Sequence, residues 1–215
     1  MYIYIIGAGA QGRVVLDVLE SNNIENSISF IDDNKDYWGK KINGVEILGG
    51  INKIPSKSIV HIALGNPFYR RNVYLRLKAK RVKFLNVIHK SAIIMNTVSL
   101  GKGIFIGAGV IVNCNSKIND FVILNSRCLI EHDSIIENYA SVAPAACVGG
   151  RVLIKKYSFI GSSAVILART NVGEKSIIGM GSVVTKSFGN NILAFGNPAK
   201  IIKKINKNFN WNIVL

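Results

Sequence analysis

Residues 94 to 183 carry a strict six-residue repeat, and this repeat limits the chain to very few folds. Leu, Ile or Val occupies the first place of fifteen consecutive sixes that start at Ile94, without an insertion. The fifth place always holds a small or β-branched residue, from Val98 to Ser182. An α-helix requires a period of ~3.6 residues and a flat strand a period of ~2. A fixed period of six is instead typical of a solenoid of short strands joined by tight corners.

Three sixes close one triangular coil in such a solenoid, so the repeat predicts five coils of eighteen residues. Each coil stacks on the last at roughly the 4.8 Å spacing of paired strands. The first place points into the prism, and Ile88 with Ala92 extends the pattern to a sixth coil. Glycines after the first place are expected to permit corner conformations that other residues resist. These are Gly101, Gly107, Gly149, Gly161, Gly173 and Gly179. An inert solenoid is the alternative to a functional one.

The start of the chain has the pattern of a nucleotide-binding βαβ unit. A buried strand over residues 2–6 leads into the GxGxxG loop Gly7 to Gly12, an amphipathic helix over 13–21, and a second strand over 27–31. That strand ends at Asp32-Asp33. Glycines let backbone N–H groups approach a phosphate at a helix N-terminus, and a carboxylate at the strand end accepts from a ribose or base. A tight turn in an ordinary βαβ unit is the alternative.

The α/β segment is too short for a full dinucleotide fold. Buried strands are predicted over 58–64 and 83–87, with a helix over 68–80 between them. A dinucleotide fold has two such halves, and here the repeat replaces the second. The segment therefore favours a mononucleotide or a nucleotide-linked sugar over NAD. The expected domains are a Rossmann-like domain at 1–87, a β-helix at 88–184 and a closing tail at 185–215.

The composition limits which kinds of partner the chain is expected to bind. The net charge is +15, but the lysines are scattered and the densest cluster is Lys200, Lys203, Lys204 and Lys207. Without an aromatic-flanked basic stripe, a polyanionic small ligand or a solvated surface is favoured over nucleic acid. No apolar run reaches the ~18 residues of a membrane span, and the first residues predict a strand rather than a signal peptide. Three cysteines without metal spacing, including inward-facing Cys128, agree with a cytoplasmic protein.

One histidine in the repeat is a candidate catalytic residue. His132 lies between Glu131 and Asp133 at a third place, which should face outward near a corner. The adjacent acids can fix its tautomer and raise its basicity. Eighteen-residue stacking puts Cys114 beneath it and Gly150 above it. Because Gly150 has no side chain to cover it, its N–H is a candidate hydrogen-bond donor to an oxyanion. An ordinary surface histidine is the alternative, and Cys114 is expected to be a wall residue.

Six motifs in a fixed order resemble the PglD-like sugar acetyltransferases. They are Gly7 to Gly12, Ile31-Asp32-Asp33, Ala63-Leu64-Gly65-Asn66, Val87 to Ala92, Glu131 to Asp133, and Gly196 to Lys200. The resemblance implies a left-handed parallel β-helix after the Rossmann-like half domain, and a homotrimer with acetyl-CoA between neighbouring solenoids. It also implies His132 as general base and Asp133 as the acid that tunes it.

The same resemblance assigns the binding residues. The nucleotide sugar would contact Gly9, Ala10, Gln11, Asp32, Asp33 and Gly65. The CoA groove would contain Ser141, Ser162 and Met180. Gln11 and Ser141 depart from the family pattern, because relatives often carry histidine at these places.

The predicted function is acetylation of the 4-amino group of a nucleotide-linked sugar, expected to be a UDP sugar, in bacterial glycan biosynthesis. Acetyl-CoA is the co-substrate, transfer is direct, and no metal is expected. O-acetylation of sialic acid would use the same catalytic parts. A metal-dependent β-helix hydratase needs about three histidine ligands, whereas the repeat holds one. An NAD-binding regulator is the remaining alternative.

Overall fold

The computed structural model describes residues 2–24 and 27–211. The chain divides into two compact units, Met1–Lys90 and Ser91–Leu215. The first unit is a parallel α/β half domain and the second is a parallel β-solenoid, so the predicted fold class is confirmed. In the described part of the chain, neither helix is long and apolar enough to span a membrane.

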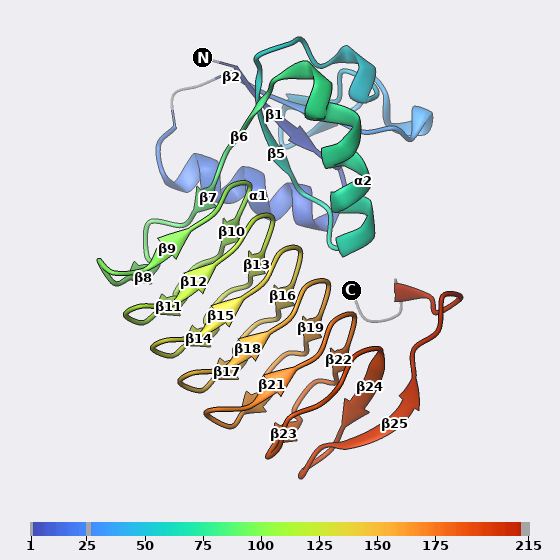
Figure 1. The fold of residues 1–215 in the computed structure, drawn as a ribbon. Helices are drawn as coiled ribbons and strands as arrows, with labels where there is room; N and C mark the ends of the chain where they lie inside the picture. Colours follow the sequence, from blue (N-terminus) through green and yellow to red (C-terminus); the bar gives the residue numbers. More distant parts are fainter. Residues whose placement is uncertain (1, 25–26, 212–215) are drawn as a thin grey trace. The chain divides into compact units, whose positions relative to one another are not determined.

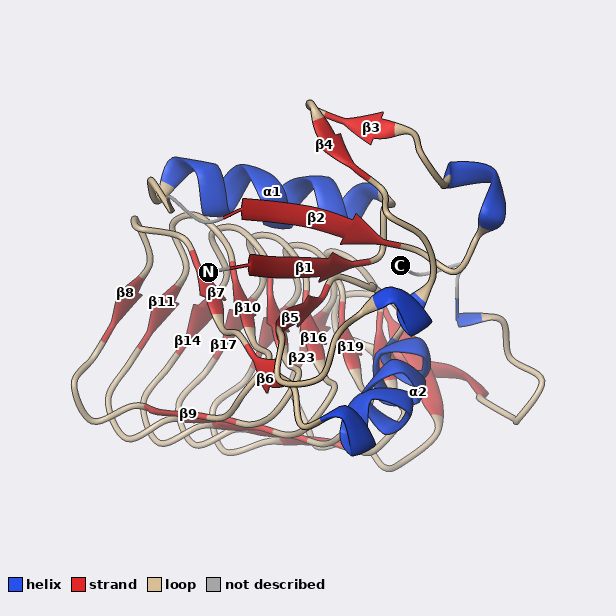
Figure 2. Ribbon diagram, turned by 90° about the horizontal axis from the view of Figure 1, so that it is seen from above, coloured by secondary structure: helices blue, strands red, loops and turns tan. Residues whose placement is uncertain are grey.

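A four-stranded parallel sheet forms the centre of the N-terminal unit (Figure 2). Its strands are β1 (Tyr2–Ile6), β2 (Ser27–Ile31), β5 (Ile59–Ile62) and β6 (Lys83–Phe84), in the order β2-β1-β5-β6. From β1 the chain continues to β2, which pairs with one edge of β1, and then crosses to β5, which pairs with the other edge of β1. The carboxyl ends of β1 and β5 therefore form a topological switch point, where open α/β sheets bind ligands.

Two helices accompany this sheet. Helix α1 (Ala10–Ser21) buries Val15, Leu16 and Leu19, and it begins directly after Gly9. Helix α2 (Pro67–Leu77) begins at Pro67 because Asn66 Oδ1 accepts hydrogen bonds from the first free N–H groups of the helix, a common N-cap arrangement. The short elements are η1 (Lys35–Tyr37), β3 (Lys41–Ile42), β4 (Val45–Glu46), η2 (Ile51–Lys53), η3 (Lys78–Lys80) and β7 (Val87–Ile88).

The solenoid is a stack of coils whose strands pair with strands eighteen residues away (Figure 1). Its first face contains β10 (Phe105–Ile106), β13 (Ile123–Leu124), β16 (Ser141–Val142), β19 (Phe159–Ile160), β22 (Ile177–Ile178) and β24 (Ile192–Phe195). The second face contains β8 (Ile93–Ile94), β11 (Ile111–Val112), β14 (Leu129–Ile130), β17 (Cys147–Val148), β20 (Val165–Ile166) and β23 (Val183–Val184). The third face contains β9 (Ser99–Leu100), β12 (Lys117–Ile118), β15 (Ile135–Ile136), β18 (Leu153–Ile154) and β21 (Asn171–Val172). Strand β25 (Lys200–Lys204) pairs antiparallel with β24.

The repeat pattern predicts the solenoid core correctly. First-place side chains from Ile106 to Ile178 are at most 1% exposed, whereas Ile94 and Leu100 are partly exposed. Fifth-place side chains from Ile104 to Ser182 are buried as well, and burial raises the pKa of the Cys128 thiol to about 12. A thiol in this environment behaves as a small apolar group.

The predicted role of the repeat glycines is wrong. The left-handed corner residue is at the fourth place, where Asn115, Asp133 and Arg151 have φ values of 58°, 59° and 58°. The glycines after the first place have no positive φ. They are needed because the next coil passes too close: a Cβ on Gly149 would lie 2.7 Å from Ala168 N, and a Cβ on Gly161 would lie 2.5 Å from Met180 N.

Candidate active site

Buried serines fix the backbone at the corner that carries His132. Ser116 Oγ donates to Glu131 O at 2.9 Å and accepts from Ser134 N at 3.2 Å. One coil further, Ser134 Oγ donates to Gly149 O at 2.9 Å and accepts from Val152 N at 3.1 Å. Each hydroxyl thus satisfies a buried donor and a buried acceptor, which would otherwise be costly. The fifth-place serines Ser116 and Ser134 therefore fix the backbone geometry of two successive corners.

His132 occupies the expected outward position. It follows β14, at the corner between the second and third faces, and its side chain is 46% exposed. Asp133 N donates to Cys114 O at 3.0 Å, and Arg151 N donates to His132 O at 2.9 Å. These two hydrogen bonds confirm that the adjacent coils carry Cys114 on one side and Gly150 on the other.

Asp133 orients the His132 ring. The Nδ1 atom of His132 lies 2.8 Å from Asp133 Oδ2. When Nδ1–H donates to this carboxylate, the neutral ring keeps its lone pair on Nε2. Hydrogen bonds from His132 and from Asn115 Nδ2 hold the pKa of Asp133 below its usual value, so the acid is ionised. Glu131 contacts the backbone instead, since its Oε2 accepts from His132 N at 3.3 Å.

Gly150 leaves room for that ring. A Cβ built on Gly150 would lie 2.7 Å from His132 Nε2 and 2.9 Å from Cε1. Within residues 2–24 and 27–211, the Gly150 N–H donates to no protein acceptor. The corner therefore brings an acceptor nitrogen close to a residue whose N–H is available. Such a pair can take a proton from a nucleophile and stabilise an oxyanion.

The residues predicted for the CoA groove lie at another corner. Ser162 and Met180 follow first-face strands one coil apart, and Gly181 N donates to Ser162 O at 2.8 Å. The Met180 side chain is open to solvent at 80% exposure. Ser141 is buried within β16 at 4% exposure. The second face separates the Met180 corner from the His132 corner, so one chain does not bring these residues together.

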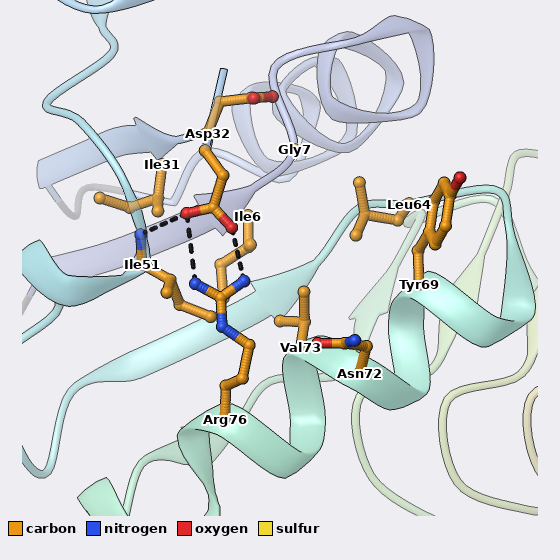
Figure 3. A pocket seen from close by; sticks show the side chains of 11 residues that line it. Ile6, Gly7, Ile31, Asp32, Ile51, Leu64, Tyr69, Asn72, Val73 and Arg76 are labelled. Carbon is orange, nitrogen blue, oxygen red and sulfur yellow. Dashed lines mark hydrogen bonds and ion pairs between the residues drawn. The ribbon is translucent and has the colours of Figure 1, made fainter. Parts of the chain in front are cut away.

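The N-terminal unit contains a cavity of about 270 Å³ at the switch point of its sheet (Figure 3). It opens at the carboxyl ends of β1, β2 and β5. Helix α2 contributes Tyr69, Asn72, Val73 and Arg76, whose spacing of i, i+3, i+4 and i+7 places them on one helix face. The other lining residues are Ile6, Gly7, Ile31, Asp32, Asp33, Ile51 and Leu64. The α2 residues were not among the predicted nucleotide contacts, although their helical spacing was a usable signal.

The two predicted acids have different environments. Asp32 holds the glycine loop, because its Oδ2 accepts from Ala8 N at 2.8 Å and its Oδ1 from Asn34 N at 2.9 Å. Asp33 forms an ion pair with Arg76 at 2.5 Å and accepts from Ile51 N at 3.0 Å. The hydrogen bond from Arg76 is the main reason why the pKa of Asp33 is below its usual value. Both acids line the cavity, and Asp33 is also paired with Arg76, which is itself a lining residue.

The remaining predicted nucleotide contacts do not line this cavity. Gly9 precedes α1, and a Cβ there would meet nothing within 4 Å, so a ligand can approach the helix N-terminus. Ala10 begins α1, while Gln11 Nε2 is buried without a hydrogen-bond partner among the described residues. The Gly65 carbonyl accepts from the buried Arg70 guanidinium. Gly12 is a packing residue, since its Cβ would meet Gly7 O.

In the part of the chain that the structure describes, no three His, Cys, Asp or Glu side chains group as a metal site would require. Both candidate sites consist instead of hydrogen-bonding groups.

Comparisons with known families and sequences agree on one kind of enzyme. The PglD N-terminal domain family matches residues 2–77, and the family of the hexapeptide repeat of succinyl-transferase matches residues 152–186. The GDP-perosamine N-acetyltransferase of Escherichia coli O157:H7 is 32% identical over 159 residues. That match covers 70% of this chain and 71% of the relative.

Solved structures share both the fold and its order of units. A histidine-to-alanine mutant of GDP-perosamine N-acetyltransferase from Caulobacter crescentus, in complex with CoA and GDP-perosamine, matches with a TM-score of 0.87 and 26% identity. The match covers 95% of this chain and 98% of the other. The acetyltransferase domain of PglB from Neisseria gonorrhoeae, in complex with acetyl coenzyme A, matches with a TM-score of 0.88 and 27% identity over 94% and 98% of the two chains. The second unit thus has the fold of a left-handed β-helix acetyltransferase.

Proposed function

Because the chain belongs to the PglD-like sugar acetyltransferases, we propose that it acetylates the 4-amino group of a nucleotide-linked amino-deoxy sugar. The chain is an acyltransferase that acts on a sugar amine, with acetyl-CoA as acetyl donor. The observation that carries the finer proposal is the His132 ring, whose Nδ1 is engaged by Asp133 and whose Nε2 lies against Gly150.

The nucleotide is proposed to occupy the cavity at the switch point of the N-terminal sheet. Its apolar walls, Ile6, Ile31 and Val73, fit a planar base, and the open N-terminus of α1 suits a phosphate. The predicted nucleotide is UDP, whereas two relatives are named for GDP-perosamine. A panel of nucleotide sugars decides between these two bases.

The proposed reaction is direct acyl transfer. The sugar amine attacks the thioester carbonyl carbon, and the tetrahedral intermediate collapses by breaking the carbon–sulfur bond. His132 Nε2 takes the proton that the nitrogen loses and returns it to the departing CoA sulfur. Asp133 stabilises the imidazolium that forms in between, and the Gly150 N–H donates to the oxyanion. Atoms and charge balance without a covalent enzyme intermediate.

Neighbouring chains are proposed to complete the acetyl-CoA site as a homotrimer. The second face lies between the His132 corner and the corner of Ser162 and Met180. The sixth places along this face are all apolar, and two of them, Ile93 and Val165, are 52% and 44% exposed. Burial of such a face against another chain is favourable. It would also bring the His132 corner of one chain near the Met180 corner of another, which supports a shared CoA groove.

The decisive test replaces His132. We expect His132→Ala to reduce acetyl transfer by roughly 10²- to 10⁴-fold with little change in KM, the usual contribution of a general base. Oligomeric state and thermal stability should remain those of the wild type, because the side chain is half-exposed. An unchanged rate would remove the general-base role.

The substrate is tested with a panel of UDP-, dTDP- and GDP-linked 4-amino sugars, the matching 4-hydroxy sugars, and free sialic acid. Consumption of acetyl-CoA with amino sugars alone supports the proposal. Turnover of sialic acid alone would favour the O-acetyltransferase alternative. Binding of NAD without any acetyl transfer would favour a regulator.

A further inference from the structure

Asp133 has a cationic neighbour in addition to the His132 ring. Arg151 Nε lies 3.5 Å from Asp133 Oδ2, the same oxygen that receives the imidazole at 2.8 Å. The other oxygen, Oδ1, accepts from Asn115 Nδ2 at 3.3 Å. The carboxylate is therefore held from the coil below, from its own coil and from the coil above.

This arrangement follows from the geometry of the repeat. Asn115, Asp133, Arg151 and Arg169 occupy the same fourth place in four successive coils, and all four have left-handed φ values. The shared conformation directs their side chains from one corner in a column. Asp133 is the one acid in this column, with an amide below and a guanidinium above. Backbone hydrogen bonds fix the spacing between Asp133 and Arg151, since Arg151 N donates to His132 O at 2.9 Å.

We propose that Arg151 is a positioning residue for the general base, acting through Asp133. It holds the carboxylate so that Oδ2 faces Nδ1 of His132, and it shares the negative charge that Asp133 presents to the ring. The inference rests on the proposed function, because it needs His132 as the proton acceptor. Nothing in the reaction requires Arg151 to touch either substrate.

The sign of its effect on the histidine follows from the charges that face the ring. The negative charges of Asp133 and Glu131 favour the protonated imidazolium, and the positive charge of Arg151 opposes it; the coil below presents Cys114. A general base has to be unprotonated to accept a proton, so removal of the guanidinium charge is expected to disfavour the reactive form of His132. The Arg151 side chain is 51% exposed, so solvent screening keeps the effect small.

Arg151→Gln tests the inference, with Arg169→Gln as matched control. Arg169 has the same corner conformation one coil further on. We expect Arg151→Gln to move the acidic limb of the kcat/KM profile to higher pH by about half a unit. It should also lower kcat by roughly three- to tenfold through loss of orientation. Arg151→Lys should restore most of the pH profile, while Arg169→Gln should match the wild type throughout.

A second measurement needs no turnover. The chain has three histidines, so the ring of His132 can be followed by NMR through a pH titration. In Arg151→Gln the ring should take up its second proton at a higher pH than in the wild type and in Arg169→Gln. An Arg151→Gln protein that titrates and turns over like the wild type would overturn the positioning role and leave the proposed function intact. Full activity of His132→Ala would overturn both.

Discussion

Each unit of this protein places an aspartate beside an arginine at its candidate site, and the two pairs differ in what they leave available. In the N-terminal unit, Arg76 contacts both oxygens of Asp33, and Ile51 N takes up further acceptor capacity. In the repeat, the shortest contact of Asp133 is with the His132 ring, and Arg151 is more distant. The first pair shapes a cavity wall, whereas the second orients a group that can react.

The two sites also differ in how they are built. The His132 site uses consecutive residues and residues one coil away, on a backbone that buried serines fix from inside. The cavity combines the ends of three strands with one face of α2. A repeat holds a reactive group rigidly but offers little volume, whereas a switch point encloses a ligand from several sides. The division suits an enzyme that has to bind a large substrate and react at one small group.

The largest expected effect is a fall in kcat when Gly150, in the His132 site, is replaced. In Gly150→Ala the new methyl group would meet His132 Nε2 at 2.7 Å, so the ring has to turn away. Because small misplacements of a catalytic group are costly, we expect kcat to fall by roughly 10²-fold. The backbone of Gly150 has no positive φ, so the fold should tolerate alanine. Steady-state kinetics and a melting curve measure the two effects.

Gly189 provides the control for that substitution. A Cβ at Gly189 meets nothing within 4 Å, and the residue lies in the same solenoid. Gly189→Ala should keep wild-type kinetics. If Gly150→Ala is as active as Gly189→Ala, the ring does not work from the position over Gly150, and the proposed geometry of the base is incorrect.

The next effect concerns stability of the corner. Ser134→Ala removes a hydroxyl that serves both Gly149 O and Val152 N in a fully buried position. Leaving buried polar groups unsatisfied costs about 1–3 kcal/mol, so Tm should fall clearly. Ser99→Ala, at an exposed strand position, should leave Tm almost unchanged. Equal Tm values for the two variants would mean that the buried hydroxyl of Ser134 does not stabilise the corner.

A smaller effect is expected in the N-terminal unit. Arg76→Ala frees the Asp33 carboxylate and removes one wall of the cavity, so nucleotide-sugar binding should weaken roughly tenfold, or ~1.4 kcal/mol. The pKa of Asp33 should rise toward its ordinary value, because Arg76 is the main cause of its lowering. Arg71→Ala is the control, since Arg71 is exposed and does not line the cavity. Isothermal titration with the preferred nucleotide sugar compares them, and equal affinities would exclude this cavity.

The sequence predicts the repeat unit better than the N-terminal unit, for a physical reason. A period of six fixes which side chains point inward and which residue lies above another, so Cys114, His132 and Gly150 could be stacked correctly without a structure. The cavity depends on how α2 approaches the sheet, which no local pattern determines. Arg76 was therefore missed, and Asp32 proved to hold the Ala8 N–H of the glycine loop.

The error about the repeat glycines has a simple origin. Sequence spacing predicts which residues lie above one another but not how closely neighbouring coils approach. The glycines were therefore explained by backbone conformation, whereas close packing is the reason for them. Contacts between chains are not encoded in the period, which is why the CoA groove remains a proposal.

The last prediction concerns His61, which is buried in the N-terminal sheet and changes stability only through pH. His61 is 1% exposed in β5, and burial lowers its pKa to about 4, although its Nδ1 contacts Leu85 O at 2.9 Å. Its NMR signals should therefore stay constant between pH 8 and about pH 5.5. The unfolded chain takes up this proton near pH 6.5, so the contribution to stability is complete above that pH and is lost as pH falls toward 4. That loss amounts to about 2 kcal/mol by pH 5. Urea unfolding at pH 7 and pH 5 should show this difference between the wild type and His61→Leu, and a parallel pH dependence of the two proteins would mean that His61 is accessible to protons in the folded state.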